Sequence, residues 1–245
     1  LEALTDDVVH SSEIEGENLP PNEVRSSIAR QLGMKNITQL VPSSSNVDSV
    51  VKMMTDATTH YDRPLDSRRL FTWHKSLFES ESRNLRITVG RYRDDHMEVV
   101  SGPYGQERVH FEAPPAYRLQ QEMDAFLSWF EKPKKDSSPL LTAGIAHFWF
   151  VTIHPFDDGN GRIARAIADM ALARAERSNQ RYYSMSKQIL KERNDYYNRL
   201  EFSQKSELDI TQWLEWFLNC LIRAIENADT TVGRVLRKAS FWTRY

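Results

Sequence analysis

The segment from Pro139 to Ile153 limits the possible folds of this chain most strongly. It is apolar on nearly every side, and a helix without a polar face is stable only when other elements cover it all round. The 245 residues, 40% apolar and 27% charged, have the ordinary composition of a soluble globular chain and can provide that cover. We therefore expect 139–153 to be a buried central helix.

Helical periodicity dominates the rest of the sequence. One strand pair stands out: Met97, Val99 and Val100 precede a Ser101–Gly105 turn, and Val109 with Phe111 follow it. The sequence thus predicts a mostly α fold, a helical bundle with one β-hairpin. We expect the other helices around residues 4–15, 21–32, 47–54, 70–78, 114–130, 163–175, 187–202 and 210–228.

Net charge, cysteine content and the length of apolar runs limit the partners and the cellular compartment that we expect for this protein. The net charge of -2 gives no reason to expect nucleic acid or a membrane as the main partner. The one cysteine, Cys220, excludes an internal disulfide and fits a reducing compartment. No apolar run is long enough to span a bilayer, and no signal peptide is recognisable. We expect a cytoplasmic protein, and we expect this chain, which begins at Leu1, to be a fragment of it.

A glycine-rich turn follows the central helix, and its residue types suit phosphate. Gly159 and Gly161 allow backbone conformations that point successive N–H groups into one concavity. The next helix adds its positive N-terminal end. Arg162 and Arg165 are three residues apart and share one face of its first turn, and guanidinium groups match phosphate oxygens.

Two further residues of this turn can carry chemistry. Asp158 offers the hard oxygen ligand that Mg²⁺ takes beside nucleotide phosphates. His154 ends the central helix, and an imidazole can accept a proton near neutral pH. Structural alternatives stay open here: His154 as a core histidine, Asp158 as a helix cap, and Arg165 paired only with Asp169 one turn on.

Residues 154–165 resemble the defining motif of the Fic family. That motif is a histidine, any residue, Phe, any residue, Asp or Glu, Gly-Asn-Gly-Arg, two free positions and Arg, and every specified position is met here. The resemblance extends over about 65–221, including Gly90–Arg93. It also reaches the N-terminus, where Ser11 to Gly16 resemble the inhibitory motif of the family: Ser or Thr, three residues, Glu, then Gly or Asn.

The resemblance implies a Fic-type helical bundle with a hairpin flap and an N-terminal helical extension. It also implies an enzyme that transfers AMP from ATP, with Mg²⁺, to a Ser, Thr or Tyr hydroxyl of a target protein. In that scheme His154 is the base, Phe156 anchors the loop and Asp158 holds Mg²⁺ on the phosphates. Asn160 and the backbone of Gly159 and Gly161 stabilise charge on the α-phosphate.

The same resemblance implies a role for both arginines and for the N-terminal helix. Arg162 holds the β-phosphate side of the nucleotide. Arg165 holds the γ-phosphate when free and Glu15 when inhibited, and Ser11 supports the inhibitory helix. Glu15 lies in the last turn of that helix, where the helix dipole disfavours a carboxylate, so it needs a cation unless it is simply solvated.

The resemblance also implies which residues contact the target protein and the adenine base. The hairpin is the flap along which the target docks, with contacts at Met97, Val99, Val100, Ser101 and Gly102. Tyr196 and Tyr197 fall where the family has adenine-pocket aromatics, with a core or surface pair as the alternative. A common family Asn is Gln204 here.

The expected division is an N-terminal helical region at 1–62 with the inhibitory helix at about 4–15, a catalytic domain at 63–222 and a helical extension at 223–245. Other functions stay open: a hydrolase that removes AMP, with Glu15 positioning water; transfer of another nucleotide or phosphate-containing group; and a non-catalytic interaction module. The intact motif argues against the last. Self-modification and homo-oligomerisation are open as well.

Overall fold

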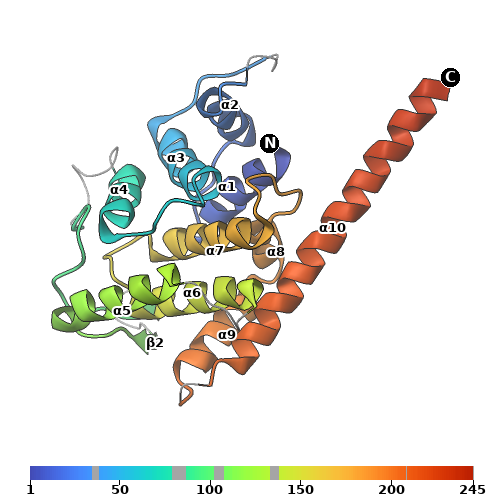
Figure 1. Cartoon of the computed structure of the whole chain (residues 1–245). Helices are drawn as coiled ribbons and strands as arrows, with labels where there is room; N and C mark the ends of the chain where they lie inside the picture. The colour runs from blue at the N-terminus through green and yellow to red at the C-terminus, as the bar shows by residue number, and fades with distance from the viewer. Residues whose placement is uncertain (35–38, 79–86, 102–107, 133–137, 208, 245) are drawn as a thin grey trace.

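The structure is a computed structural model that describes residues 1–34, 39–78, 87–101, 108–132, 138–207 and 209–244. Within these residues helices dominate, with one two-stranded sheet, so the predicted mostly α fold is confirmed (Figure 1). The elements in chain order are α1 (Glu2–Ile14), α2 (Pro21–Gln31), α3 (Ser45–Thr59), α4 (Ser67–Phe78), β1 (Glu98–Ser101), β2 (Arg108–Glu112), the 3-10 turn η1 (Ala116–Arg118), α5 (Leu119–Glu131), α6 (Pro139–Ile153), α7 (Asn160–Glu176), α8 (Met185–Lys191), α9 (Arg193–Gln204) and α10 (Thr211–Arg244).

Helix α6 is the central helix that its apolar sequence predicts. It packs against α5, α7 and α10. The approach of α10 is close because Gly144 has no side chain: a Cβ there would lie 3.0 Å from both Leu214 Cδ2 and Phe217 Cδ1. Trp213 of α10 is fully buried and donates its indole N–H to the Gly144 carbonyl at 2.8 Å. A side chain at this glycine would therefore push the two helices apart.

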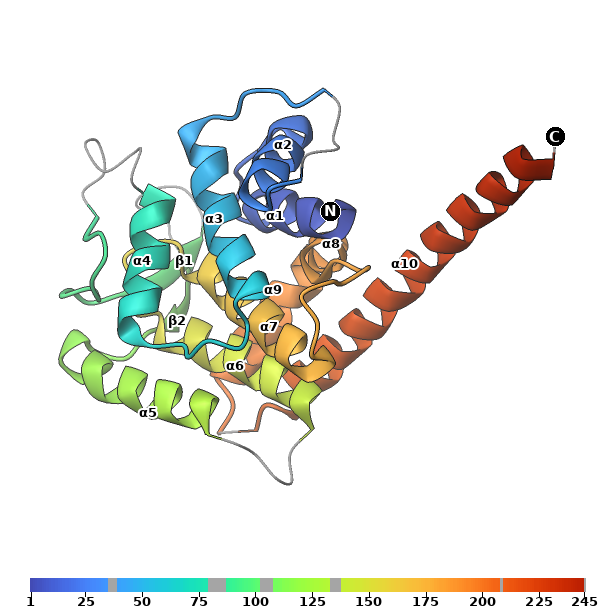
Figure 2. The same cartoon turned by 45° about the horizontal axis from the view of Figure 1, so that its top comes forward.

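The N-terminal helices pack onto the bundle on the side of α7. Helix α1 contacts α2, α3, α7 and α8, and α3 also contacts α4 and α7. Figure 2 shows α1, α2 and α3 gathered on one side, over α7 and α8. Buried Val8, Ile14 and Ile28 belong to the same hydrophobic cluster as α6 and α7. The N-terminal region therefore shares one core with the motif helices.

Three helices differ from their predicted extents. The helix expected around 114–130 begins at Leu119, after the 3-10 turn η1. The single helix expected around 187–202 is two, α8 and α9, broken at Glu192 (φ -112°, ψ 24°). The helix expected to end near residue 228 continues as α10 to Arg244, and its end projects away from the bundle in Figures 1 and 2. The predicted limit between residues 222 and 223 thus falls inside one helix.

The predicted hairpin is present. Strands β1 and β2 pair antiparallel, with Val99 opposite Phe111 and Val100 opposite Val109. His110 is therefore the extra residue of a β-bulge between these two pairs. Ser101 ends β1, and Gly102, a predicted flap contact, lies outside the described residues. Among the helices that the structure describes, none combines the length and apolar character needed to cross a bilayer.

Candidate active site at the amino terminus of α7

The loop between α6 and α7 turns on two left-handed residues. His154 ends α6 with φ 51° and ψ 58°, and Gly159 precedes α7 with φ 79°. Glycine adopts this conformation at little cost, whereas histidine does so at a cost that the surrounding structure must offset. The loop therefore places His154 beside the first turn of α7.

Side chains of the loop itself and of the neighbouring helix α4 fix the shape of the loop. The Asn160 amide accepts the Phe156 N–H at 3.0 Å and donates to the Phe156 carbonyl at 2.7 Å. Fully buried Phe156 stacks on His74, with ring centroids 4.2 Å apart. His74 Nδ1 accepts the Gly90 N–H at 3.0 Å, so Nε2 carries the proton and donates to the Asp158 carbonyl at 3.2 Å. Burial lowers the pKa of His74 to about 4, so this ring is neutral.

Arg93 holds the backbone at His154 and Pro155 and is only 2% exposed. Its Nε donates to the His154 carbonyl at 2.8 Å, and its backbone N–H donates to the Pro155 carbonyl at 2.9 Å. Its remaining side-chain donors reach the Pro114 carbonyl at 2.5 Å and the Asp95 carbonyl at 2.6 Å. Arg93 thus stabilises the left-handed conformation that presents the His154 side chain.

The His154 imidazole has the state that proton acceptance requires. Its Nδ1 lies 3.2 Å from the Val151 carbonyl, so Nδ1 carries the proton and Nε2 keeps its lone pair. Burial lowers the pKa of His154, and the positive charge of Arg93 adds to this effect. The ring is therefore neutral near pH 7 and can act as a base at Nε2.

The N-terminal segment binds the side chain of Arg165. This arginine is 2% exposed. Its Nε donates to Ser11 Oγ, and its Nη2 donates both to the Ser11 carbonyl and to Glu15 Oε1, each at 2.8 Å. The alternative in which Arg165 pairs only with Asp169 is wrong, because Arg165 engages α1 while Asp169 forms an ion pair with Arg181 at 2.7 Å.

The Glu15 carboxylate also lies over the first turn of α7. A Cβ at Gly161 would be 2.1 Å from Glu15 Oε1, so only glycine leaves room for the carboxylate in this position. Unpaired N–H groups and the helix dipole make such an N-terminus an anion site. In this structure, Glu15 is the anion beside it.

A second acidic residue, Glu17, pairs with the other arginine. Arg162 Nη1 donates to both Glu17 carboxylate oxygens, at 3.0 and 2.9 Å. Arg162 is 3% exposed, and its guanidinium carbon lies 5.3 Å from the centre of the Phe78 ring. Glu17 is not among the site residues predicted from the sequence, and the feature that could have indicated it is its position two residues after Glu15.

Asp158 is exposed, and its Oδ1 accepts the Gly159 N–H. Gly159, not Asp158, is the cap residue of α7, so the alternative role of Asp158 as a helix cap is wrong. Among the described residues no group of three His, Cys, Asp or Glu side chains could hold a metal by itself. A single exposed carboxylate does fit Mg²⁺, which takes most of its ligands from phosphates and water in nucleotide sites.

Tyr196 does not lie where a base could stack on it, which corrects the prediction. It is 1% exposed and packs among Trp213 and Trp216 of α10. Its hydroxyl lies 3.0 Å from His147 Nε2, inside the bundle. The physical reason is that the inner face of α9 is buried against α10. Tyr196 is a core residue.

Tyr197 has the opposite orientation and is 40% exposed. Its hydroxyl donates to the Ile14 carbonyl at 3.4 Å, near the end of α1, and its ring lies 5.5 Å from the Arg193 guanidinium carbon. Tyr197 therefore remains a candidate for an adenine contact. Gln204 donates to Thr152 Oγ1 at 3.3 Å.

The hairpin is joined to the bundle through Glu201 of α9. Glu201 contacts His110 Nδ1 at 2.6 Å and accepts from Arg108 at 2.8 Å. Lys205, His110 and Arg108 together lower the pKa of Glu201 to about 2. Met97 and Val99 are half-buried, whereas Val100 is 45% exposed. The paired strands thus hold a fixed position relative to α9.

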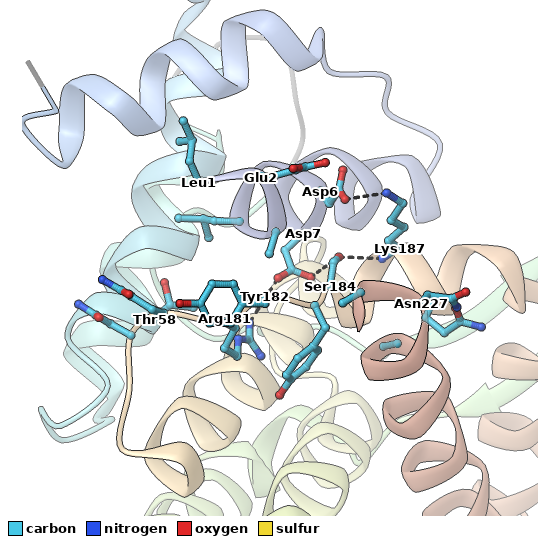
Figure 3. A pocket seen from close by; sticks show the side chains of 18 of the residues that line it. Leu1, Glu2, Asp6, Asp7, Thr58, Arg181, Tyr182, Ser184, Lys187 and Asn227 are labelled. Atoms are coloured by element: carbon cyan, nitrogen blue, oxygen red, sulfur yellow. Dashed lines mark hydrogen bonds and ion pairs between the residues drawn. The ribbon is translucent and has the colours of Figure 1, made fainter. Parts of the chain in front are cut away.

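A buried polar cluster attaches α1 to the bundle. Arg181 lies between Asp7 of α1, at 3.3 Å, and Asp169 of α7, at 2.7 Å, and both carboxylates are 1% exposed. Asp7 also accepts from the Ser184 hydroxyl at 2.6 Å and the Ser186 N–H at 3.2 Å. Figure 3 shows Asp7, Arg181 and Ser184 together at the wall of a cavity of about 680 Å³. This cluster was not predicted from the sequence.

Models of known protein families match both the N-terminal helices and the helices that carry the motif. The model of the Fic/DOC family matches residues 64–172, and the model described as Domain of unknown function (DUF4172) matches residues 1–34. The Protein adenylyltransferase Fic of Nematostella vectensis is 25% identical over 238 residues, which are 94% of this chain and 50% of that protein. The protein of the same name from Aedes aegypti is 25% identical over 92% of this chain and 42% of its own length. The chain thus spans about half the length of the curated relatives it matches.

Solved structures agree with the fold. A Fic family protein from Desulfovibrio desulfuricans G20 has a TM-score of 0.70 and 26% identity, covering 94% of this chain and 65% of that one. A Fic domain containing signaling protein from Bacteroides thetaiotaomicron has a TM-score of 0.66 over 93% of this chain and 85% of its own, and at 19% identity it supports the fold alone. The chain therefore contains a Fic/DOC domain, at residues 64–172, within the Fic fold.

Proposed function

We propose that this protein is a protein adenylyltransferase, which transfers AMP from ATP to a Ser, Thr or Tyr hydroxyl of a target protein. One observation carries the proposal: the neutral His154 imidazole lies beside an anion-binding helix terminus that bears two buried arginines. A base next to a phosphate site is the arrangement that nucleotidyl transfer to a hydroxyl needs. The name of the relatives, protein adenylyltransferase, supports the same reaction.

The reaction needs one proton transfer and one phosphoryl substitution. His154 Nε2 takes the proton of the target hydroxyl as its oxygen attacks the α-phosphorus of ATP. The bond between that phosphorus and the oxygen bridging to the β-phosphate breaks, and pyrophosphate leaves. Arg93 is a positioning residue, because it holds the His154 carbonyl at 2.8 Å but is itself buried. The target oxygen then carries AMP.

The phosphates are held by the first turn of α7. The backbone N–H groups near Gly159 and Gly161 and the helix dipole stabilise charge at the α-phosphate. Asn160 keeps the loop in shape through its two bonds to Phe156. Arg162 and Arg165 bind the β- and γ-phosphates. Asp158 would hold Mg²⁺ together with the phosphates, and that ion offsets the negative charge that develops on the leaving pyrophosphate.

Glu15 makes the described conformation an inhibited one in this proposal. While Glu15 and Ser11 occupy Arg165, the γ-phosphate has no anchor. ATP then binds with its α-phosphate out of line with the incoming hydroxyl, and in-line geometry accounts for a large part of such a rate. Release of α1 from Arg165 would restore the active arrangement.

The target protein docks along the hairpin. An extended target segment adds to the strands by backbone hydrogen bonds, with contacts at Met97, Val99, Val100, Ser101 and Gly102. Because Glu201 fixes β2 on α9, the docked hydroxyl has a defined position. Residues 63–222 form the catalytic part of this scheme, 1–62 the regulatory part and 223–245 an extension.

The test compares Glu15→Gly with wild type at equal ATP and Mg²⁺. AMP adducts on the protein itself and on lysate proteins are counted by mass spectrometry. We expect strong adduct formation only in Glu15→Gly. Glu13→Gly, an exposed glutamate of the same turn, controls for weakening of the helix and should behave like wild type. Addition of His154→Ala should remove the gain.

Two outcomes of this experiment would contradict the inhibitory role of Glu15. If Glu15→Gly forms no more adduct than wild type, Glu15 is not inhibitory. If wild type instead removes AMP from a modified protein and Glu15→Gly does not, Glu15 positions a water molecule and the protein is a hydrolase.

A further inference from the structure

We propose that Glu17 is a second inhibitory carboxylate, which blocks Arg162 while Glu15 blocks Arg165. This inference rests on the proposed function, since it assigns both arginines to ATP phosphates. The two blocked residues lie three apart on α7, and the two blocking residues lie two apart after α1. One short segment, residues 15–17, would thus close both phosphate positions.

The backbone around Gly16 explains how two carboxylates reach the same site. Helix α1 ends at Ile14, and Gly16 adopts φ +87°, a conformation that residues with a side chain rarely adopt. The Glu15 and Glu17 N–H groups both bond to the Ser12 carbonyl at 3.0 Å. This turn at the helix end directs Glu15 and Glu17 to α7.

The Glu17 contact leaves Arg162 no exposed surface for phosphate. Nη1 of Arg162 is bonded to both Glu17 oxygens, and the residue is 3% exposed. Phe78 lies against the guanidinium. A β-phosphate can therefore reach this side chain only after Glu17 leaves.

Both guanidiniums also retain unused donors. In the part of the chain that the structure describes, Arg162 Nε and Arg165 Nη1 are buried without an acceptor. Buried donors normally find a partner. A carboxylate offers two oxygens, whereas the β- and γ-phosphates of ATP offer more, so replacement of Glu15 and Glu17 by ATP would supply further acceptors.

The two carboxylates predict different nucleotide profiles. Glu17 competes with the β-phosphate, which both ADP and ATP carry. Glu15 competes with the γ-phosphate, which only ATP carries. Loss of Glu17 should therefore strengthen binding of ADP and ATP, loss of Glu15 should strengthen binding of ATP alone, and AMP should respond to neither change.

Isothermal titration calorimetry with AMP, ADP and ATP tests this on the full chain. The variants are Glu17→Gln, Glu15→Gln and, as a matched control, Glu13→Gln. We expect Glu17→Gln to lower the Kd for ADP and for ATP about fivefold, equivalent to about 1 kcal/mol. Glu17 is partly exposed, so a larger gain is not expected. Glu15→Gln should lower the Kd for ATP alone, and Glu13→Gln should change none.

An unchanged ADP Kd in Glu17→Gln, with a lower ATP Kd in Glu15→Gln, would overturn the role of Glu17 and leave the proposed function standing. Arg162→Ala provides the second distinction. If Arg162→Ala binds ADP as well as Glu17→Gln does, Arg162 is not a phosphate ligand, and both the inference and the phosphate assignments of the proposed function are wrong.

Discussion

The free energy of unfolding should fall between pH 6 and pH 8, because Asp7 stays largely protonated in the folded protein and is ionised in the unfolded chain. Asp7 is buried with Asp169, and the two carboxylates share the Arg181 guanidinium. Burial, reinforced by the charge of Asp169, raises the pKa of Asp7 from 3.8 to about 8. In the unfolded chain the carboxyl ionises near its ordinary pKa. The folded protein therefore holds up to one more proton than the unfolded chain in this window.

The sign and size follow from proton linkage. A folded-state pKa that lies above the unfolded one makes a stabilising contribution that falls as pH rises towards 8. With a pKa of about 8 for Asp7, the free energy of unfolding should fall by about 2 kcal/mol from pH 6 to pH 8. Since α1 carries Asp7, the same change should weaken the docking of α1.

Urea unfolding at pH 6 and pH 8 measures this effect when wild type is compared with Asp7→Asn. An asparagine resembles the protonated carboxyl but cannot ionise in the unfolded chain. The variant should therefore be more stable than wild type at both pH values and should lack about 2 kcal/mol of the pH dependence. Asp6→Asn is the matched control, because Asp6 is a partly exposed neighbour that pairs with Lys187. Equal pH dependence in wild type and Asp7→Asn would refute the reasoning.

Three further changes probe the site, each in the Glu15→Gly background. His154→Ala should lower AMP transfer by about 10²–10⁴-fold through loss of the base; unchanged transfer would place the base elsewhere. Asp158→Ala, like excess EDTA, should nearly abolish transfer, and full activity in EDTA would contradict a role for Mg²⁺. Val99→Pro should lower target modification at unchanged ATP affinity, because proline distorts the strand; normal modification would remove the hairpin from target docking.

The fold was predictable where local pattern and packing agree. The apolar stretch 139–153 gave α6 with both ends correct, since a helix that is apolar all round has one stable place in a bundle. No sequence pattern predicts the helix break at Glu192, because neither glycine nor proline lies there. The Glu192 carboxylate accepts hydrogen bonds from Arg223 of α10 at 2.7 and 2.5 Å, a contact that cannot be read from the sequence.

The site was predictable as far as the two motifs carry it, including the Glu15–Arg165 pair between them. Two contacts outside the motifs were missed: Glu17 meets Arg162 across 145 positions, and Arg93 acts on backbone carbonyls, which leave no mark in a sequence. Tyr196 and Tyr197 show a different limit. Adjacent residues on a helix point about 100° apart, so one of them entered the core and the other stayed exposed.

AMP transfer is tested most directly with ATP labelled either at the α-phosphate or at the γ-phosphate. Glu15→Gly protein is incubated with each, with Mg²⁺, then denatured and washed free of nucleotide. The α-label should remain on protein and the γ-label should not, because the γ-phosphate leaves within pyrophosphate. Retention of the γ-label, or of neither label, would contradict AMP transfer.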